Sequence, residues 1–73
     1  MSRLSAAKPG ERVRITDISH SDVRLQLMRW GLMTGSWVTC QAVLPGGPVV
    51  VRRHHQEIAL GRDLAERIEV ELL

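Results

Sequence analysis

A chain of 73 residues has room for one domain, and we expect residues 1–73 to fold as a single unit. Its hydrophobic content of 44% is too high for a disordered segment. No apolar run approaches the about 20 residues that cross a membrane, so we expect no membrane insertion. The single cysteine cannot form an internal disulfide, which favours a cytoplasmic location, and the net charge of +2 permits an anionic partner.

The amino-terminal part of the chain predicts a turn and then a half-buried strand. Pro9 and Gly10 favour the turn, because proline fixes one φ angle and glycine permits a positive one. Residues 12–16 then alternate polar and apolar side chains, which is the pattern of a strand with one face in the core. Ile18 is expected to stay in the core where this strand ends.

One helix is predicted to follow, and the rest of the chain is organised around it. Ser21 or Asp22 can cap its free N–H groups, and the charge of Asp22 suits the positive end of the helix dipole. Gly31 stands where a left-handed cap needs a residue without a Cβ, and Leu32 can fold back onto the last turn. At about 100° per residue, the face that should cover the core carries Val23, Leu27 and Trp30.

The remaining residues predict four short strands and one turn of helix. Their expected ranges are strands at 37–44, 49–53 and 57–60, a helical turn at 63–66 and a last strand at 67–72. The break at 45–48, with two glycines between prolines, is typical of a hairpin loop. So small a sheet leaves two bare edges unless it closes. We therefore predict a mostly β fold, a small five-stranded barrel with one α-helix after the first strand and a short helical turn before the last.

The core of this barrel must consist mainly of leucine, valine and isoleucine, because the chain has no phenylalanine or tyrosine. Residues on the apolar phase of each strand or helix should be buried. They are Val13, Ile15, Leu27, Trp30, Val38, Cys40, Val49, Val51, Ile58, Leu60, Ile68 and Val70.

The order of these motifs resembles the FeoA family of small SH3-like barrels, which are associated with the bacterial ferrous iron transporter FeoB. The matching motifs cover nearly the whole chain: the turn Pro9-Gly10-Glu11, the helix from Arg24 to Gly31 with Leu32 and Gly35, the hairpin at 45–48, and the closing segment 58–70. Trp30 and Thr34 depart from the family pattern, which usually has leucine and proline there.

The resemblance implies a cytosolic accessory or regulatory protein of ferrous iron transport. Its partner would be the cytoplasmic GTPase region of FeoB, and it could also form a homo-oligomer. The same barrel occurs as the C-terminal domain of metal-dependent repressors, so a stand-alone domain of that kind is an alternative.

The outer face of the predicted helix is the expected partner-binding surface. Leu25 lies nearly opposite the core face, and Met33 is expected close by after the turn. Arg24 and Arg29 flank Leu25, and an apolar centre with an arginine rim is the composition of a protein-contact surface. The alternative is that Leu25 packs under the N-terminal arm, against Leu4.

No catalytic set of residues is recognisable, and we do not expect an enzyme. The candidate metal ligands are His20, His54 and His55, together with Cys40. His54 and His55 are adjacent and would face opposite sides of a strand, while Cys40 is expected to point inward as a small hydrophobe. We expect no cofactor, and an adventitious or regulatory divalent metal is the remaining option.

A basic run allows a different function. Arg52, Arg53, His54 and His55 could contact phosphates, and a small barrel with such a strand could bind nucleic acid. Single-stranded nucleic acid usually stacks on several exposed aromatic side chains, and Trp37 is the one candidate near this run. We therefore keep nucleic-acid binding as the alternative to a protein partner.

Overall fold

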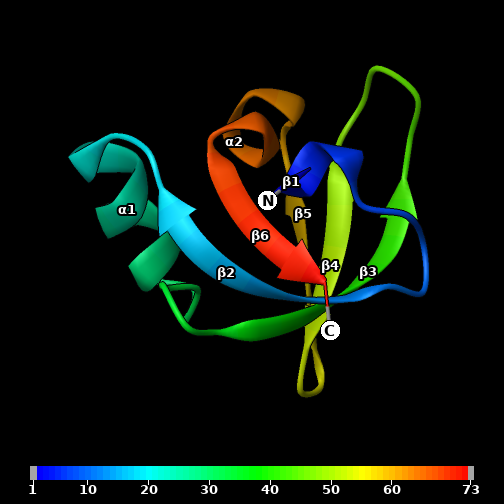
Figure 1. Cartoon of the computed structure of the whole chain (residues 1–73), viewed down its shortest axis with the longest axis horizontal. Coiled ribbons are helices and arrows are strands. Elements are labelled where there is room, and N and C mark those ends of the chain that lie inside the picture. Colours follow the sequence, from blue (N-terminus) through cyan, green and yellow to red (C-terminus); the bar gives the residue numbers. More distant parts are fainter. Residues whose placement is uncertain (1, 73) are drawn as a thin grey trace.

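The computed structural model describes residues 2–72, whose strands form one antiparallel sheet that curls around a core, with two short helices beside it (Figure 1). The sheet order is β1-β6-β2-β3-β4-β5. In chain order the elements are β1 (Ser2–Arg3), the 3₁₀ turn η1 (Leu4–Ala6), β2 (Arg12–Ile18), α1 (Ser21–Met28), β3 (Trp37–Val43), β4 (Val49–Arg53), β5 (Gln56–Leu60), α2 (Arg62–Glu66) and β6 (Ile68–Leu72).

The predicted mostly β fold is confirmed, with the helix after the first long strand and the helical turn before the last one. All five predicted strands are present. The sheet also has a sixth strand, because Ser2 and Arg3 pair with Val70 and Glu69 of β6. A strand of two residues is too short to show an alternating pattern, so the sequence gives no signal for it.

β2 continues past the predicted end of the first strand because its pairing with β6 shifts register between Ile15 and Asp17. In an unbroken strand, Ile15 and Ile18 would face opposite sides of the sheet, since side chains alternate. The irregular position restores Ile18 to the core side, and both isoleucines are 1% exposed. The expected burial of Ile18 is therefore confirmed, and it depends on one irregular step in the ladder.

The core consists of small and aliphatic side chains, and the predicted core residues are buried with one exception. Trp30 is only partly buried, although it packs against the core. The reason is that α1 ends at Met28, so that Trp30 lies in the turn after the helix and not on its inner face. Further core residues are Leu4, Ala7, Ile18, Val23, Leu32 and Ala65.

The beginning of α1 differs from the prediction, which placed the cap at Ser21 or Asp22. His20 occupies the N-cap position with a φ of 71°, and within residues 2–72 no side chain caps the helix there. Because the chain turns in the left-handed region at His20, the helix begins earlier, and Ser21 and Asp22 lie in its first turn. Asp22 still places negative charge near the positive end of the helix dipole.

The turn that follows α1 agrees with the prediction, although the helix itself ends earlier, at Met28. Gly31 has a φ of +78°, and its N–H donates to the backbone oxygen of Met28 at 3.0 Å. The N–H of Leu32 donates to the backbone oxygen of Leu27, also at 3.0 Å. This pair of hydrogen bonds is a Schellman motif, and the two leucines that it brings together are both in the core.

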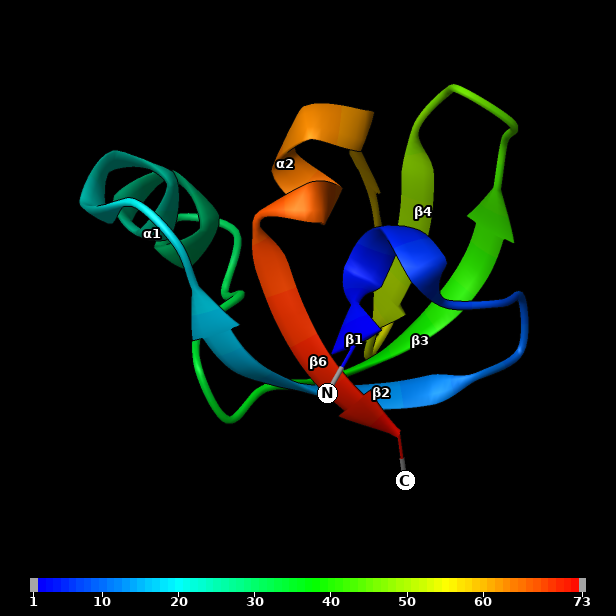
Figure 2. The same ribbon diagram turned by 45° about the horizontal axis from the view of Figure 1, so that its top comes forward.

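The sheet is open between its edge strands, β1 and β5, and helical segments join the two edges. η1 follows β1 and α2 follows β5, and these segments pack against each other (Figures 1 and 2). The guanidinium group of Arg62 in α2 donates to the backbone oxygens of Leu44 at 2.8 Å, Gly47 at 3.1 Å and Ser5 at 3.4 Å. One side chain therefore ties α2 both to the β3–β4 loop and to η1.

Replacing Gly31 tests the turn that ends α1. Gly31→Val should lower the free energy of unfolding by more than about 1 kcal/mol, because a β-branched residue is strained at positive φ. The added Cβ would also lie 2.8 Å from Nη1 of Arg53. Gly61→Val is the matched control, since Gly61 has a φ of −56° and open space around it. Equal melting temperatures for the two variants would contradict the assignment.

Replacing Arg62 tests the closure of the sheet. Arg62→Ala should lower the free energy of unfolding by about 1–3 kcal/mol, because three backbone oxygens lose a charged donor. Chemical denaturation measures the change. Arg29→Ala removes an equal charge from an exposed position and should leave the stability nearly unchanged. A similar loss in both variants would mean that net charge, and not the contacts of Arg62, is responsible.

Candidate functional site

The outer face of α1 carries exposed apolar side chains. Leu25 is 61% exposed, Met28 48% and Met33 44%. Leu25 and Met28 are three residues apart in the helix, so they are neighbours on its surface, while Met33 follows the turn after the helix. α1 stands at one side of the barrel, and its buried residues are Val23 and Leu27 (Figures 1 and 2). We call Leu25, Met28 and Met33 the apolar patch.

The predicted rim of this patch consists of Arg24 and Arg29, which are both exposed. Nη2 of Arg24 lies 3.4 Å from the backbone oxygen of Ile18, so this arginine reaches back toward the end of β2. The alternative packing of Leu25 against Leu4 is wrong, because Leu4 is enclosed in the core at 1% exposed while Leu25 stays in solvent.

Met28 is the member of the apolar patch that the sequence prediction did not include. The prediction placed the end of the helix near Gly31 and put Met28 at the margin of the buried face. At about 100° per residue, Met28 lies about 100° from Leu27 and about 140° from Val23, so its side chain points away from the buried side of α1 and is 48% exposed. The spacing of three residues from Leu25 was the available signal.

The candidate metal ligands do not come together. His20 is the N-cap residue of α1, whereas His54 and His55 form the turn between β4 and β5. Cys40 is fully buried in the core, as predicted. In the part of the chain that the structure describes, no group of three or more histidine, cysteine, aspartate or glutamate side chains could hold a metal ion.

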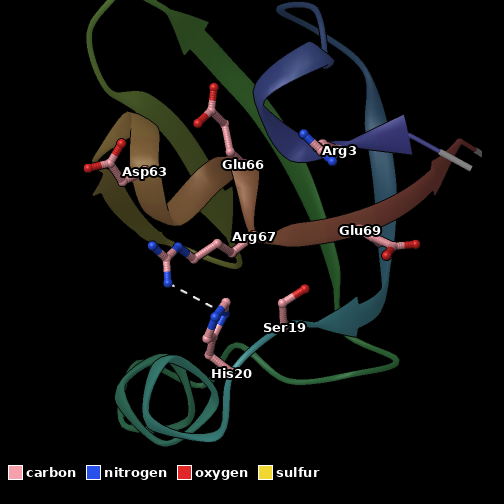
Figure 3. A pocket seen from close by; sticks show the side chains of 7 residues that line it. All are labelled: Arg3, Ser19, His20, Asp63, Glu66, Arg67 and Glu69. Carbon is pink, nitrogen blue, oxygen red and sulfur yellow. Dashed lines mark hydrogen bonds between the residues drawn. The ribbon is translucent and has the colours of Figure 1, made fainter.

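His20 lines a groove of about 340 Å³ with charges of both signs (Figure 3). Nη1 of Arg67 lies 3.4 Å from Nδ1 of His20. The other charged side chains around the groove are Arg3, Asp63, Glu66 and Glu69.

A second groove, of about 410 Å³, is basic. The structure brings Arg52, Arg53 and His54 of the predicted basic run together with Trp37, and it adds Arg12 from β2. We call the space lined by these five residues the basic groove. The sequence could not place Arg12 there, because its position depends on the pairing of β2 with β3.

The antiparallel sheet, with a helix inserted after its first long strand, defines an SH3-like barrel, and the apolar patch and basic groove are features of its surface. A family model described as the FeoA domain matches residues 2–72. The chain therefore belongs to the FeoA family, which is associated with iron transport. Across residues 2–72, no helix is both long and apolar enough to span a membrane.

Solved structures agree with this assignment. The crystal structure of an iron uptake regulatory protein (FeoA) is 28% identical, with a TM-score of 0.88, over 99% of this chain and 96% of that one. The solution structure of a FeoA protein from Chlorobium tepidum is 32% identical, with a TM-score of 0.85, over 97% of this chain and 70% of that one. A comparison with curated protein sequences gives no match.

The crystal structure of ScaR with bound Zn²⁺ shares the fold with a TM-score of 0.90. The two sequences are 23% identical, and the match covers 100% of this chain and 37% of the ScaR chain. At this identity the similarity concerns the fold alone.

The reactivity of Cys40 tests its assignment to the core. Burial raises the pKa of the Cys40 thiol above its ordinary value of 9.0, and the charge of Glu11 adds to the rise. A thiol reagent should therefore react slowly with the native protein and at once in concentrated guanidinium chloride.

The same pKa shift predicts how stability depends on pH. The unfolded state loses the thiol proton first, so stability falls as the pH rises through about 9, and Cys40→Ala should remove this part of the slope. In the reactivity experiment, rapid modification of Cys40 by the thiol reagent in the native protein would contradict the burial of this side chain.

Proposed function

We propose that this protein is a cytoplasmic accessory protein of ferrous iron transport that regulates uptake by binding the cytoplasmic GTPase region of FeoB. It acts through contact and catalyses no reaction. Membership of the FeoA family supports the connection to iron transport. The proposed contact surface is the apolar patch together with Arg24 and Arg29.

The observation that carries this proposal is the exposure of Leu25. A single exposed leucine is ordinary, because much of any folded surface is apolar. Leu25, however, is 61% exposed with Met28 beside it on the helix. Arginine at the rim can pair with carboxylates of a partner, and apolar side chains at the centre lose their contact with water on binding.

The position of the patch also suits binding without unfolding. Val23 and Leu27 hold the opposite side of α1 in the core, so the outer residues contribute little to the stability of the barrel. A partner can cover them as they stand, and no buried side chain has to move. A second copy of this chain is the other occupant that the patch allows, and the experiment separates the two.

Leu25→Asp should weaken binding to the isolated GTPase region of FeoB by about tenfold or more, because a charge enters the centre of the apolar contact. Its melting temperature should stay nearly unchanged, since Leu25 is exposed. Isothermal titration calorimetry measures the affinity, and sedimentation of the chain alone measures self-association.

Leu44→Asp is the matched control, because Leu44 is 51% exposed in the β3–β4 loop, away from α1 (Figure 1). It should bind as the unmodified protein does. Undiminished binding by folded Leu25→Asp would rule out the proposed surface. Loss of self-association without any binding to FeoB would assign the patch to a second copy.

A further inference from the structure

The basic groove has an unbalanced charge. Arg12, Arg52, Arg53 and His54 line it with Trp37, and among the described residues no aspartate or glutamate does. The other lining residues carry no charge; they are Ser36, Trp37, Val38 and Thr39. A cleft lined by charges of one sign concentrates its electric field in the space between them, which attracts ions of opposite sign.

Neighbouring carboxylates do not neutralise these arginines. Within residues 2–72, the recorded ion pair joins Arg14 to Glu71. Glu57 is the cross-strand partner of Arg52 in β4 and β5 and is the nearest carboxylate by register; it accepts a hydrogen bond from Gln41 at 3.0 Å and forms no recorded ion pair with Arg52. Glu57 can offset part of the charge of Arg52, but three arginines line the groove, so a net positive charge remains for a ligand.

Strand register fixes where two of the arginines lie. Thr39 of β3 is paired with Arg12 of β2 on one side and with Arg52 of β4 on the other. Adjacent strands are about 4.8 Å apart, so the backbones of these arginines stand about 10 Å apart across the sheet, with their side chains on the same face. That span is suited to a small ligand between the two guanidinium groups.

Each guanidinium group is also held by a different neighbour. That of Arg12 lies 5.3 Å from the centre of the Trp37 ring, a cation–π contact. Nε of Arg52 donates to the backbone oxygen of His54 at 3.2 Å. Arg53 lies over Gly31, where a side chain would collide with it. The donors are therefore partly ordered before a ligand arrives, which lowers the entropy cost of binding.

We propose that the basic groove binds the phosphate group of a small ligand, either inorganic phosphate or a nucleotide. A phosphate offers several oxygens and up to two charges at one point, which suits several planar guanidinium forks better than a single carboxylate does. Trp37 is partly exposed, and the guanidinium groups of Arg12 and Arg14 lie 5.3 Å and 5.9 Å from the centre of its ring, so the organic part of a nucleotide would contact the part of the ring that these two groups leave open. The proposal does not depend on the contact through α1.

A longer nucleic acid is less well matched to this surface. Binding along a single strand uses a row of aromatic side chains on which successive bases stack. The chain has two aromatic residues, and Trp30 is partly buried against the core. One ring in one groove is enough for one nucleotide.

The test is a titration of the full chain. NMR signals of the two tryptophan indole N–H groups monitor binding during the titration. Inorganic phosphate and a nucleoside triphosphate are added at constant ionic strength, with sodium chloride as the reference. The signal of Trp37 should shift and saturate with both ligands, while that of Trp30 should stay in place. Tighter binding of the nucleotide than of phosphate would support the role of the ring.

Two variants of Arg52 show whether the groove is responsible. Arg52→Ala should lower the affinity about tenfold or more, because it removes a charged donor. Arg52→Lys keeps the charge but loses the fork, and it should also bind more weakly. Arg52 is exposed, so both variants should fold, which their melting temperatures check. Lys8→Ala is the matched control, because Lys8 is exposed and does not line the basic groove, and it should bind with unchanged affinity.

Three results would overturn the proposal. The first is a shift of Trp37 that chloride reproduces at equal ionic strength. The second is equal affinity of Arg52→Ala and the unmodified protein. The third is binding only to single-stranded oligonucleotides, with an affinity that grows with length, which would assign the groove to nucleic acid.

Discussion

The left-handed turn at Gly31 connects the helix, the core and the basic groove. Its backbone geometry stops α1 and lets Leu32 return to the core, where it lies with Leu27. The missing side chain also leaves room for the guanidinium of Arg53. A residue with a Cβ would strain the turn and displace an arginine of the groove. The same glycine therefore helps to shape the ends of both proposed surfaces.

The parts of the fold that could be predicted are those with a local chemical cause. Gly31 marks the end of α1 because only glycine adopts its φ angle without strain, and the alternating strands show their buried face directly. The start of α1 could not be found in this way, because His20 adopts a positive φ that its residue type does not announce. β1 and the irregular step after Ile15 arise from pairing with β6, which is distant in the sequence.

The same distinction applies to the surfaces. The exposure of Leu25 and Met33 follows from helix periodicity and the turn, and both were predicted. Met28 is absent from the prediction, although helix periodicity also turns it away from the buried residues Val23 and Leu27. Only part of the basic groove could be predicted from the sequence. Arg52 and Arg53 are adjacent in the chain, but their proximity to Arg12 depends on the order and register of three strands.

The shared fold leaves the role of this barrel open, because the same architecture occurs in the FeoA proteins and in part of ScaR. The backbone is set by buried aliphatic residues, and these can be conserved in kind while the surface changes completely. Both proposed surfaces lie outside the core, in the apolar side chains on α1 and the arginines of the basic groove. These groups cost solvation or repulsion when the protein is alone, and a bound partner or anion relieves that cost.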